Sequence, residues 1–168
     1  GGTLFLDEVG ELKPDAQARL LRFLHDRTYE RLGEAHERRA DVRILAATNR
    51  PLEEAVQAGR FREDLFYRLN VVTLTLPPLR ERPEDVLPLA RHYLALFGRK
   101  RGRRGREFSA ETEQAIMEHS WPGNLRELRQ VIHESASQSN GEWIDLPDLP
   151  ATIRLGSLLD QTPNLRPR

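Results

Sequence analysis

The chain has 168 residues, enough for one ordinary domain or two small ones with a real hydrophobic core. Its 26 basic residues balance 26 acidic ones, so the formal net charge is +0 and bulk charge gives no indication of nucleic-acid binding. It has no cysteine, no apolar stretch long enough to cross a membrane and no leader pattern, which favours a cytoplasmic protein without a membrane partner.

The first predicted element is a strand over Thr3 to Leu6, an apolar run without a polar face that is typical of central parallel strands covered on both sides. Two carboxylates, Asp7 and Glu8, follow it directly. Ligands of open α/β sheets bind beyond the carboxyl ends of strands, so one acid could hold magnesium there and the other could orient water. The alternative is a strand followed by a solvated acidic turn. A buried strand at the first residues also indicates an interior piece of a larger domain.

Helix and strand patterns alternate after this strand. Pro14 can begin an amphipathic helix that runs to about Asp26, and the stretch 28–39 predicts a short turn or hairpin. Val42 to Ala47 predict a second buried strand, which also ends in polar residues. The remaining expectations are a short helix from Pro51 to Ala58 closed by Gly59, a helix carrying Phe61, Leu65, Phe66 and Leu69, and a third strand from Val71 to Leu76.

Pro77 and Pro78 interrupt this alternation and predict a boundary, with an α/β unit over residues 1–78 and a helical unit over 79–155. The helical unit is predicted to contain a helix from Pro83 to about Phe97, one capped by Ser109, and one beginning with a capping box of Asn124 and Glu127. Residues 156–168 have no periodic pattern and predict a linker. The arginine-rich run 99–106 lacks aromatic residues, which favours a solvated loop over phosphate contact.

The polar ends of the two buried strands are the candidate catalytic groups. If the strands lie side by side, Asp7 and Glu8 share a site with Thr48 and Asn49. Nucleotide hydrolysis needs a metal-holding acid, a residue that polarises water, and neutral hydrogen-bonding groups near the terminal phosphate, and all three kinds are present.

Three arginines could supply the positive charge that such a site requires. Arg62, Arg68 and Arg126 are planar donors that match phosphate. In a helix, the six residue steps from Arg62 to Arg68 correspond to about 240° around the axis, which suits a role across a subunit boundary. For either arginine alone, a surface residue is the simpler interpretation.

Five sequence blocks occur in the order found in bacterial enhancer-binding proteins, the AAA+ ATPases that activate sigma-54 RNA polymerase. The blocks are GGTLFLDEVGEL from Gly1, ILAATNR from Ile44, FREDLFYRLN from Phe61, LPPLRER from Leu76 and WPGNLREL from Trp121. The resemblance runs from Gly1 to about Arg154. It implies an α/β fold, a partial AAA+ P-loop NTPase core with a parallel sheet and flanking helices, followed by an all-helical lid.

The resemblance also implies roles for the candidate residues. Asp7 and Glu8 correspond to the Walker B pair, for magnesium and for the attacking water, Thr48 and Asn49 to sensor I, Arg62 and Arg68 to arginine fingers that reach the neighbouring subunit's nucleotide, and Arg126 to sensor II. ATP and Mg2+ are the implied substrate and cofactor. The implied assembly is a ring, a hexamer or heptamer, that remodels the closed promoter complex of sigma-54 RNA polymerase. Arg31, Leu32 and Gly33 resemble the loop that helps transmit this motion.

Three family features are absent from these 168 residues. No glycine is followed by lysine, so the phosphate-cradling pattern G-x-x-x-x-G-K-[ST] is missing. The sigma-contacting Gly-Ala-Phe-Thr-Gly-Ala loop is missing too, as is the helix-turn-helix that would bind enhancer DNA in a signal-responsive or two-component regulator. We therefore expect little ATPase activity from this chain alone.

Three other functions remain open from the sequence. The first is another AAA+ remodelling ATPase, and the second is a non-enzymatic helical module that binds DNA or protein through the arginine-rich run. The third, a metal-dependent hydrolase using Asp7 and Glu8 directly, lacks a further ligand cluster. The five histidines have no metal-ligand spacing and are interpreted as structural or surface residues: His25, His36, His92, His119 and His133.

Overall fold

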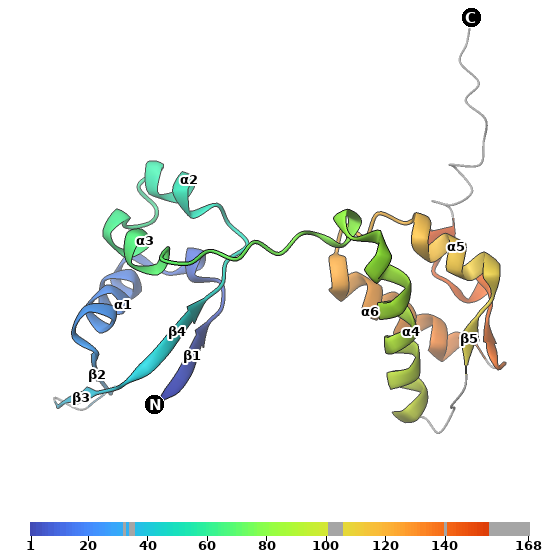
Figure 1. Cartoon of the computed structure of the whole chain (residues 1–168), viewed down its shortest axis with the longest axis horizontal. Coiled ribbons are helices and arrows are strands. Elements are labelled where there is room, and N and C mark those ends of the chain that lie inside the picture. The colour runs from blue at the N-terminus through green and yellow to red at the C-terminus, as the bar shows by residue number, and fades with distance from the viewer. Residues whose placement is uncertain (32, 34–35, 101–105, 140, 155–168) are drawn as a thin grey trace, which may run out of the picture. The chain divides into compact units, whose positions relative to one another are not determined.

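The computed structural model describes residues 1–31, 33, 36–100, 106–139 and 141–154. The chain divides into two compact units, Gly1–Thr75 and Leu76–Arg168, each with a hydrophobic core of its own (Figure 1). Some of the predictions fall outside the described residues, namely those for Leu32, for Arg101, Arg103 and Arg104 of the arginine-rich run, and for the linker 156–168.

The first unit combines a small parallel sheet with helices (Figure 1). Its elements are β1 (Gly2–Leu6), the 3-10 turn η1 (Val9–Glu11), α1 (Pro14–Asp26), β2 (Thr28–Glu30), β3 (Glu37–Arg39), β4 (Val42–Ala46), α2 (Leu52–Gln57) and α3 (Glu63–Leu69). Strands β1 and β4 pair in parallel, with Leu4 opposite Ile44. The expected α/β class with a parallel sheet is confirmed, and β2 and β3 form the predicted hairpin.

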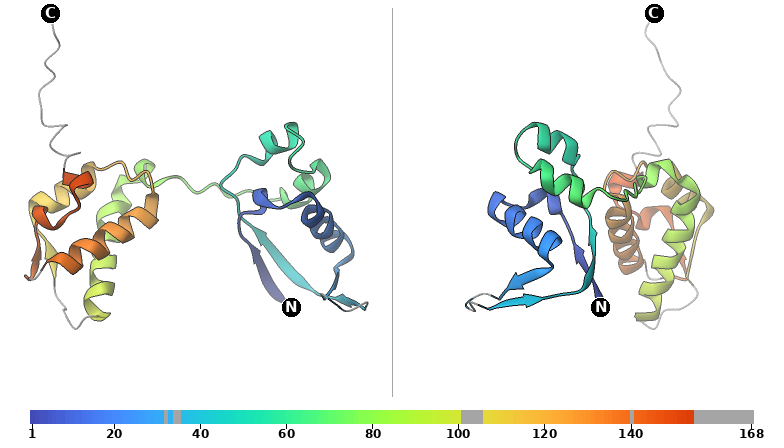
Figure 2. Two further views of the ribbon diagram at one scale, coloured as in Figure 1. Left: turned by 180° about the vertical axis from the view of Figure 1, so that it is seen from behind. Right: turned by 60° about the vertical axis from the view of Figure 1, so that its left-hand side comes forward.

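The helices pack on one side of the β1–β4 pair (Figure 2). Helix α1 begins with Pro14 at its first position and is capped by Arg27, whose backbone is left-handed and whose N–H donates to the Phe23 carbonyl. The apolar stripe of α1 contributes Leu24 to a core shared with Phe61 and Leu65. Ile44 of β4 packs against this core, which fixes the sheet relative to the helices.

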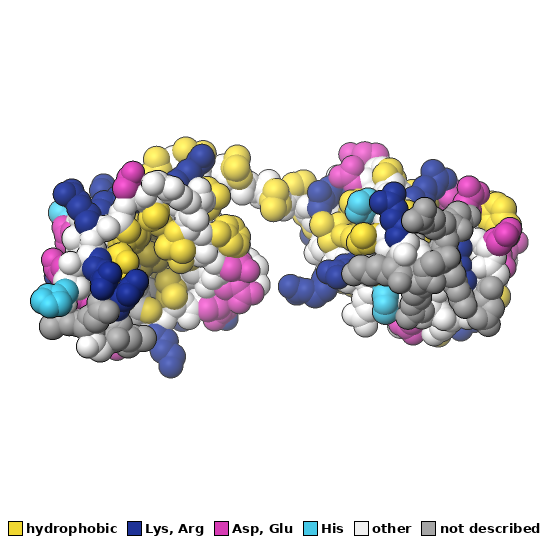
Figure 3. Space-filling model, turned by 90° about the horizontal axis from the view of Figure 1, so that it is seen from below, with side chains coloured by type: hydrophobic (Ala, Val, Ile, Leu, Met, Phe, Trp, Pro, Cys, Tyr) yellow, Lys and Arg dark blue, Asp and Glu magenta, His cyan; other side chains and the backbone are white. Residues whose placement is uncertain are grey.

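The opposite face of the β1–β4 pair is open, so the expectation of strands covered on both sides is wrong for the described residues. Phe5 and its register partner Leu45 are 59% and 44% exposed. The predicted third strand is also wrong, because residues 71–76 are extended without joining a sheet, and their large apolar side chains are 78–85% exposed. An apolar extended segment becomes a strand only when a neighbouring backbone offers hydrogen bonds. Figure 3 shows hydrophobic side chains gathered on the surface of this unit.

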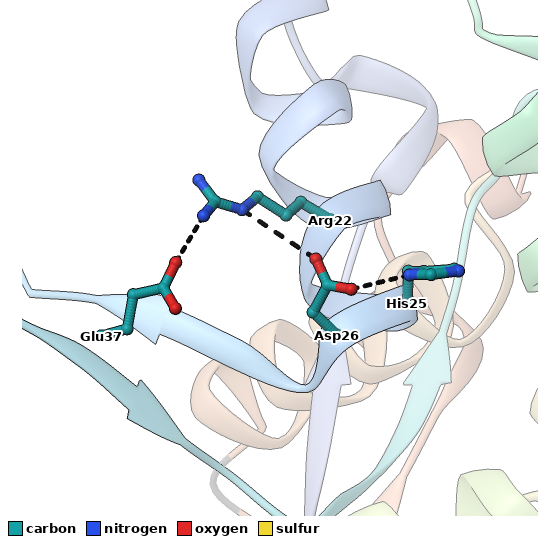
Figure 4. A network of polar contacts seen from close by, with 4 residues as sticks. All are labelled: Arg22, His25, Asp26 and Glu37. Atoms are coloured by element: carbon teal, nitrogen blue, oxygen red, sulfur yellow. Dashed lines mark hydrogen bonds and ion pairs between the residues drawn. The ribbon is translucent and has the colours of Figure 1, made fainter.

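The β2–β3 hairpin is held to α1 by exposed charges (Figure 4). The Arg22 guanidinium pairs with Glu37 of β3 and lies 4.0 Å from the Asp26 carboxylate. Asp26 in turn lies 2.7 Å from Nδ1 of His25. Because these side chains are solvated, we expect them to orient the hairpin more than to stabilise it.

The second unit is mainly helical. Its elements are η2 (Leu79–Glu81), α4 (Pro83–Lys100), β5 (Glu107–Phe108), α5 (Ala110–Glu118), α6 (Asn124–Gln138), β6 (Trp143–Ile144) and η3 (Leu146–Asp148). The three long helices enclose a core that includes Leu94, Ile116 and Ile132. The short parallel pair of β5 and β6 was not predicted, since two residues per strand are too few to show a period. In the described parts of both units, no helix is long and apolar enough to cross a membrane.

The arginine-rich run is not entirely a solvated loop, since its first two residues are the last of α4 and its last residue is part of the folded unit. Arg106 donates from its two terminal nitrogens to the carbonyls of Ala136 and Ser139, at 2.7 and 2.8 Å. These carbonyls lie at the end of α6, and the carbonyl groups in the last turn of a helix have no N–H partner within the helix. Arg106 therefore caps α6, which corrects the sequence interpretation for this position.

Candidate functional site

The ends of β1 and β4 are locked together beyond the last paired residues. The Ala47 N–H donates to the Leu6 carbonyl at 2.8 Å, and the Val9 N–H donates to the Ala47 carbonyl at 3.0 Å. Asp7 and Glu8 lie between these two bonds, beside the segment that continues into Thr48 and Asn49. The structure thus brings the four candidate residues of the first unit's sheet edge to the same place, where all four are exposed.

The two carboxylates sit on a tight left-handed turn. Glu8 has φ 52° and ψ 45°, a conformation that is uncommon for a residue with a side chain and that clusters at functional sites. Its N–H donates to Oδ1 of Asp7 at 3.1 Å. Within the described part of the chain neither carboxylate has an ion-pair partner. Exposed carboxylate oxygens beside a hydroxyl and an amide are a suitable donor set for a hard cation such as magnesium.

Gly10 lets residues 7–11, called the acid turn below, approach Thr48 closely. A Cβ at Gly10 would lie 2.8 Å from Oγ1 of Thr48 and 3.3 Å from Leu52. The same Oγ1 accepts the N–H of Arg50 at 3.1 Å, and the Arg50 guanidinium pairs with Glu11 at 2.5 Å. The acid turn and the segment after β4 are therefore fastened to each other through main chain, a side-chain contact and an ion pair.

The two arginines of the α3 region differ in their backbone. Arg62 precedes α3 as its N-cap, with an extended backbone, so the expectation of six helical steps from Arg62 to Arg68 is wrong. Arg68 lies in the last turn of α3 and is exposed. Asp64 accepts two hydrogen bonds from the Arg62 guanidinium, at 3.0 and 2.7 Å. This contact raises the pKa of Arg62 and holds the pKa of the Asp64 carboxyl below its ordinary value.

Arg126, the candidate of the second unit, is an exposed residue in the first turn of α6. The predicted capping box is only half formed there. Gly123 is the N-cap and donates its N–H to Oε2 of Glu127 at 2.7 Å, whereas Asn124 is the first helical residue. The Asn124 side chain instead accepts the N–H of Leu79 at 2.7 Å, which ties the start of the unit to the start of α6.

Sequence reasoning missed Gln17. This residue of α1 is 1% exposed, and its side-chain amide makes three hydrogen bonds to main-chain groups. A signal was present, because an amide at the position between Ala16 and Leu20 interrupts the buried side of an amphipathic helix. A buried polar side chain requires partners, and such a position is a candidate for a structural or functional role.

Comparison with known proteins identifies a family for each unit. Residues 1–75 match the sigma-54 interaction domain and residues 80–164 match the AAA+ ATPase lid domain. The alginate biosynthesis transcriptional regulatory protein AlgB of Pseudomonas aeruginosa is 54% identical over 149 residues, which are 89% of this chain and 33% of AlgB. The sigma54-dependent transcriptional activator SfnR of Pseudomonas putida is 51% identical over 149 residues, which are 89% of this chain and 41% of SfnR.

A solved structure is similar as well. The crystal structure of NtrX from Brucella abortus in complex with ATP has a TM-score of 0.84 and 34% sequence identity, over 98% of this chain and 38% of the NtrX chain. The chain spans 33% of the length of AlgB, about a third. Two matched domains in the same order, together with a relative named as a sigma54-dependent transcriptional activator, show that this chain belongs to the AAA+ sigma-54-dependent transcription activators.

Proposed function

We propose that this chain is a stretch of the ATPase machinery of a sigma-54-dependent activator, which couples ATP hydrolysis in a ring oligomer to remodelling of the closed RNA polymerase complex. The observation that carries the proposal is the locked edge of the sheet, where Asp7 and Glu8 lie beside Thr48 and Asn49. The similar NtrX protein was crystallised in complex with ATP, which supports a nucleotide as the ligand of this edge.

The roles of these residues follow from their chemistry. Asp7 would hold Mg2+, which when bound neutralises charge on the phosphate oxygens. Glu8 would accept a hydrogen bond from the attacking water and orient it. Thr48 and Asn49 would donate neutral hydrogen bonds near the terminal phosphate. The short fastenings between the two turns support this division, because electrostatic catalysis depends on groups that are fixed before the reaction.

The arginines would act on nucleotide from other parts of the assembly. Arg62 and Arg68 would supply positive charge to the site of the neighbouring subunit. Both side chains are exposed in the single chain, which such a contact across an interface requires. Arg126 would contact nucleotide as part of the lid. The complete protein would bind enhancer DNA and sigma-54 holoenzyme through segments other than these 168 residues.

Substitution of Glu8 in the native protein that contains this chain tests the proposal. Glu8→Gln keeps the shape and removes the charge, and we expect ATP turnover to fall by about 10²–10⁴-fold, the usual contribution of a general base. Binding of a fluorescent ATP analogue should persist. The matched control is Glu53→Gln, at an exposed position of α2, which should keep wild-type turnover. Normal turnover by Glu8→Gln would overturn the proposal.

The isolated 168-residue chain is expected to turn over little ATP. It contains no G-x-x-x-x-G-K-[ST] pattern, whose backbone and lysine hold the β- and γ-phosphates. Turnover by this purified chain at the rate of the native protein would contradict that expectation.

A further inference from the structure

The side chain of Gln17 joins two segments that are far apart in the sequence. Its Nε2 donates to the carbonyl of Leu12 at 2.8 Å and to the carbonyl of Arg60 at 3.0 Å. Its Oε1 accepts the N–H of Arg62 at 2.9 Å. All three partners are main-chain groups, so these hydrogen bonds hold the backbone itself and do not depend on the conformations of neighbouring side chains.

One end of this link reaches the acid turn. Leu12 is the C-cap of η1, the short turn that begins directly after Glu8. The first residue of η1, Val9, is bonded through its N–H to the Ala47 carbonyl. The main chain from Glu8 to Leu12 is therefore held at its start by the sheet and at its end by Gln17.

The other end reaches the arginine that precedes α3. The N–H of Arg62 has the Gln17 side chain as its acceptor, and the Arg60 carbonyl is bonded to the same amide. Between them, Phe61 is 3% exposed and is packed into the core with Leu65. The backbone of Arg62 is thereby fixed, while its guanidinium reaches outward and is half exposed.

We infer that Gln17 is a positioning residue that links the acid turn of one nucleotide site to the arginine offered to the neighbouring site. The inference rests on the proposed roles of Glu8 and Arg62. A displacement of the acid turn has to move the Gln17 amide or break its part-buried hydrogen bonds, and this leaves the buried Gln17 side chain without partners, which is unfavourable. The amide thus transmits the state of one site to the next.

The first test compares single variants of the native protein. Gln17→Met keeps the length and removes all three hydrogen bonds, and Gln57→Met, at an exposed position of α2, is the matched control. We expect kcat to fall about 10²-fold with KM nearly unchanged, the effect of a misplaced catalytic group. The peptide containing Arg62 should also exchange its amide hydrogens faster than in the control. Equal kcat and equal exchange in the two variants would overturn the inference.

The second test separates the two ends of the link with mixed rings. Subunits with Glu8→Gln still offer Arg62, and subunits with Arg62→Ala still offer Glu8, so mixing the two should restore part of the activity. Adding Gln17→Met to the Glu8→Gln subunit should abolish this rescue, whereas adding Gln57→Met should not. Rescue that survives Gln17→Met overturns the inference and leaves the proposed function standing. No rescue from the parent pair overturns both.

A second variant covers the case in which Gln17→Met does not assemble. Gln17→Glu keeps an acceptor for the N–H of Arg62 and loses the donors to Leu12 and Arg60. We expect protection of the Arg62 amide to be retained, while exchange in the peptide containing Leu12 rises. Unchanged exchange at Leu12 in this variant contradicts the link to the acid turn.

Discussion

Substitution of Gly10 by alanine tests whether the acid turn depends on close approach to Thr48. The new Cβ would lie 2.8 Å from Oγ1 of Thr48, 3.3 Å from Leu52 and 3.4 Å from Cβ of Arg50. The φ of Gly10 is not in the left-handed region, so alanine meets no backbone obstacle and the effect comes from the contact alone. Thr48 has to move, and its hydrogen bond from the Arg50 N–H lengthens or breaks.

The magnitude follows from three contributions. Overpacking of this kind costs about 1–3 kcal/mol. Loss of the hydrogen bond to Thr48 adds about 0.5–1.5 kcal/mol. Alanine gains about 0.4–1 kcal/mol over glycine because it restricts the unfolded chain. We therefore expect the locked edge to be destabilised by about 0.5–4 kcal/mol, with kcat reduced because Thr48 is displaced.

Native-state hydrogen exchange at the amides of Val9 and Ala47 measures the free energy of local opening directly. Gly2→Ala is the control, because no atom lies within 4 Å of a Cβ at that position. In the Thr48→Ala background, which lacks Oγ1, Gly10→Ala should cost about 1 kcal/mol less than in the wild type. If the two costs are equal, or if Gly10→Ala behaves like Gly2→Ala, the contact does not act as described.

Two further substitutions test contacts described above, one within each unit. Asn124→Ala leaves the N–H of Leu79 without its acceptor and should destabilise the second unit by about 1–3 kcal/mol in thermal unfolding. Asn124→Asp keeps an acceptor and should retain most of the stability. Gln130→Ala, on the exposed side of α6, is the control and should change the stability little. In Arg62→Ala, the pKa of Asp64 measured by NMR should rise towards its ordinary value of about 3.9. Because the pKa of Asp64 is lowered in the folded state, the contact with Arg62 stabilises the fold fully above the ordinary pKa, and this stabilisation is lost as pH falls through the lowered pKa. The contribution of the contact to stability should therefore be constant between about pH 6 and 9.

The order of elements could be predicted from the sequence because its signals are local. Pro14 marks the start of α1, and Ser109 caps α5 through the N–H of Thr112, as expected from residue type. The pairing of β1 with β4 was also predictable, since two apolar runs that both end in polar residues indicate neighbouring parallel strands.

Features that depend on distant partners could not be predicted. Asn124 has the residue type and spacing of a capping-box residue, but its side-chain oxygen accepts the N–H of Leu79, 45 positions earlier. Residues 71–76 have strand-forming side chains, but strand formation requires a partner backbone, which a local pattern does not reveal. Gln17 is a partial case, because its place on α1 marked it as a buried amide, whereas its partners Arg60 and Arg62 are distant in the sequence.

The open face of the first unit has a consequence for the colloidal behaviour of this chain. Phe5, Leu45 and the apolar side chains of residues 71–76 form exposed hydrophobic surface of the kind that favours self-association. Repulsion between molecules is weak near neutral pH, because the formal net charge is +0 and the isoelectric point is about 7.2. We expect the solubility of the isolated chain to be lowest near pH 7 and to improve at pH values that give it a net charge.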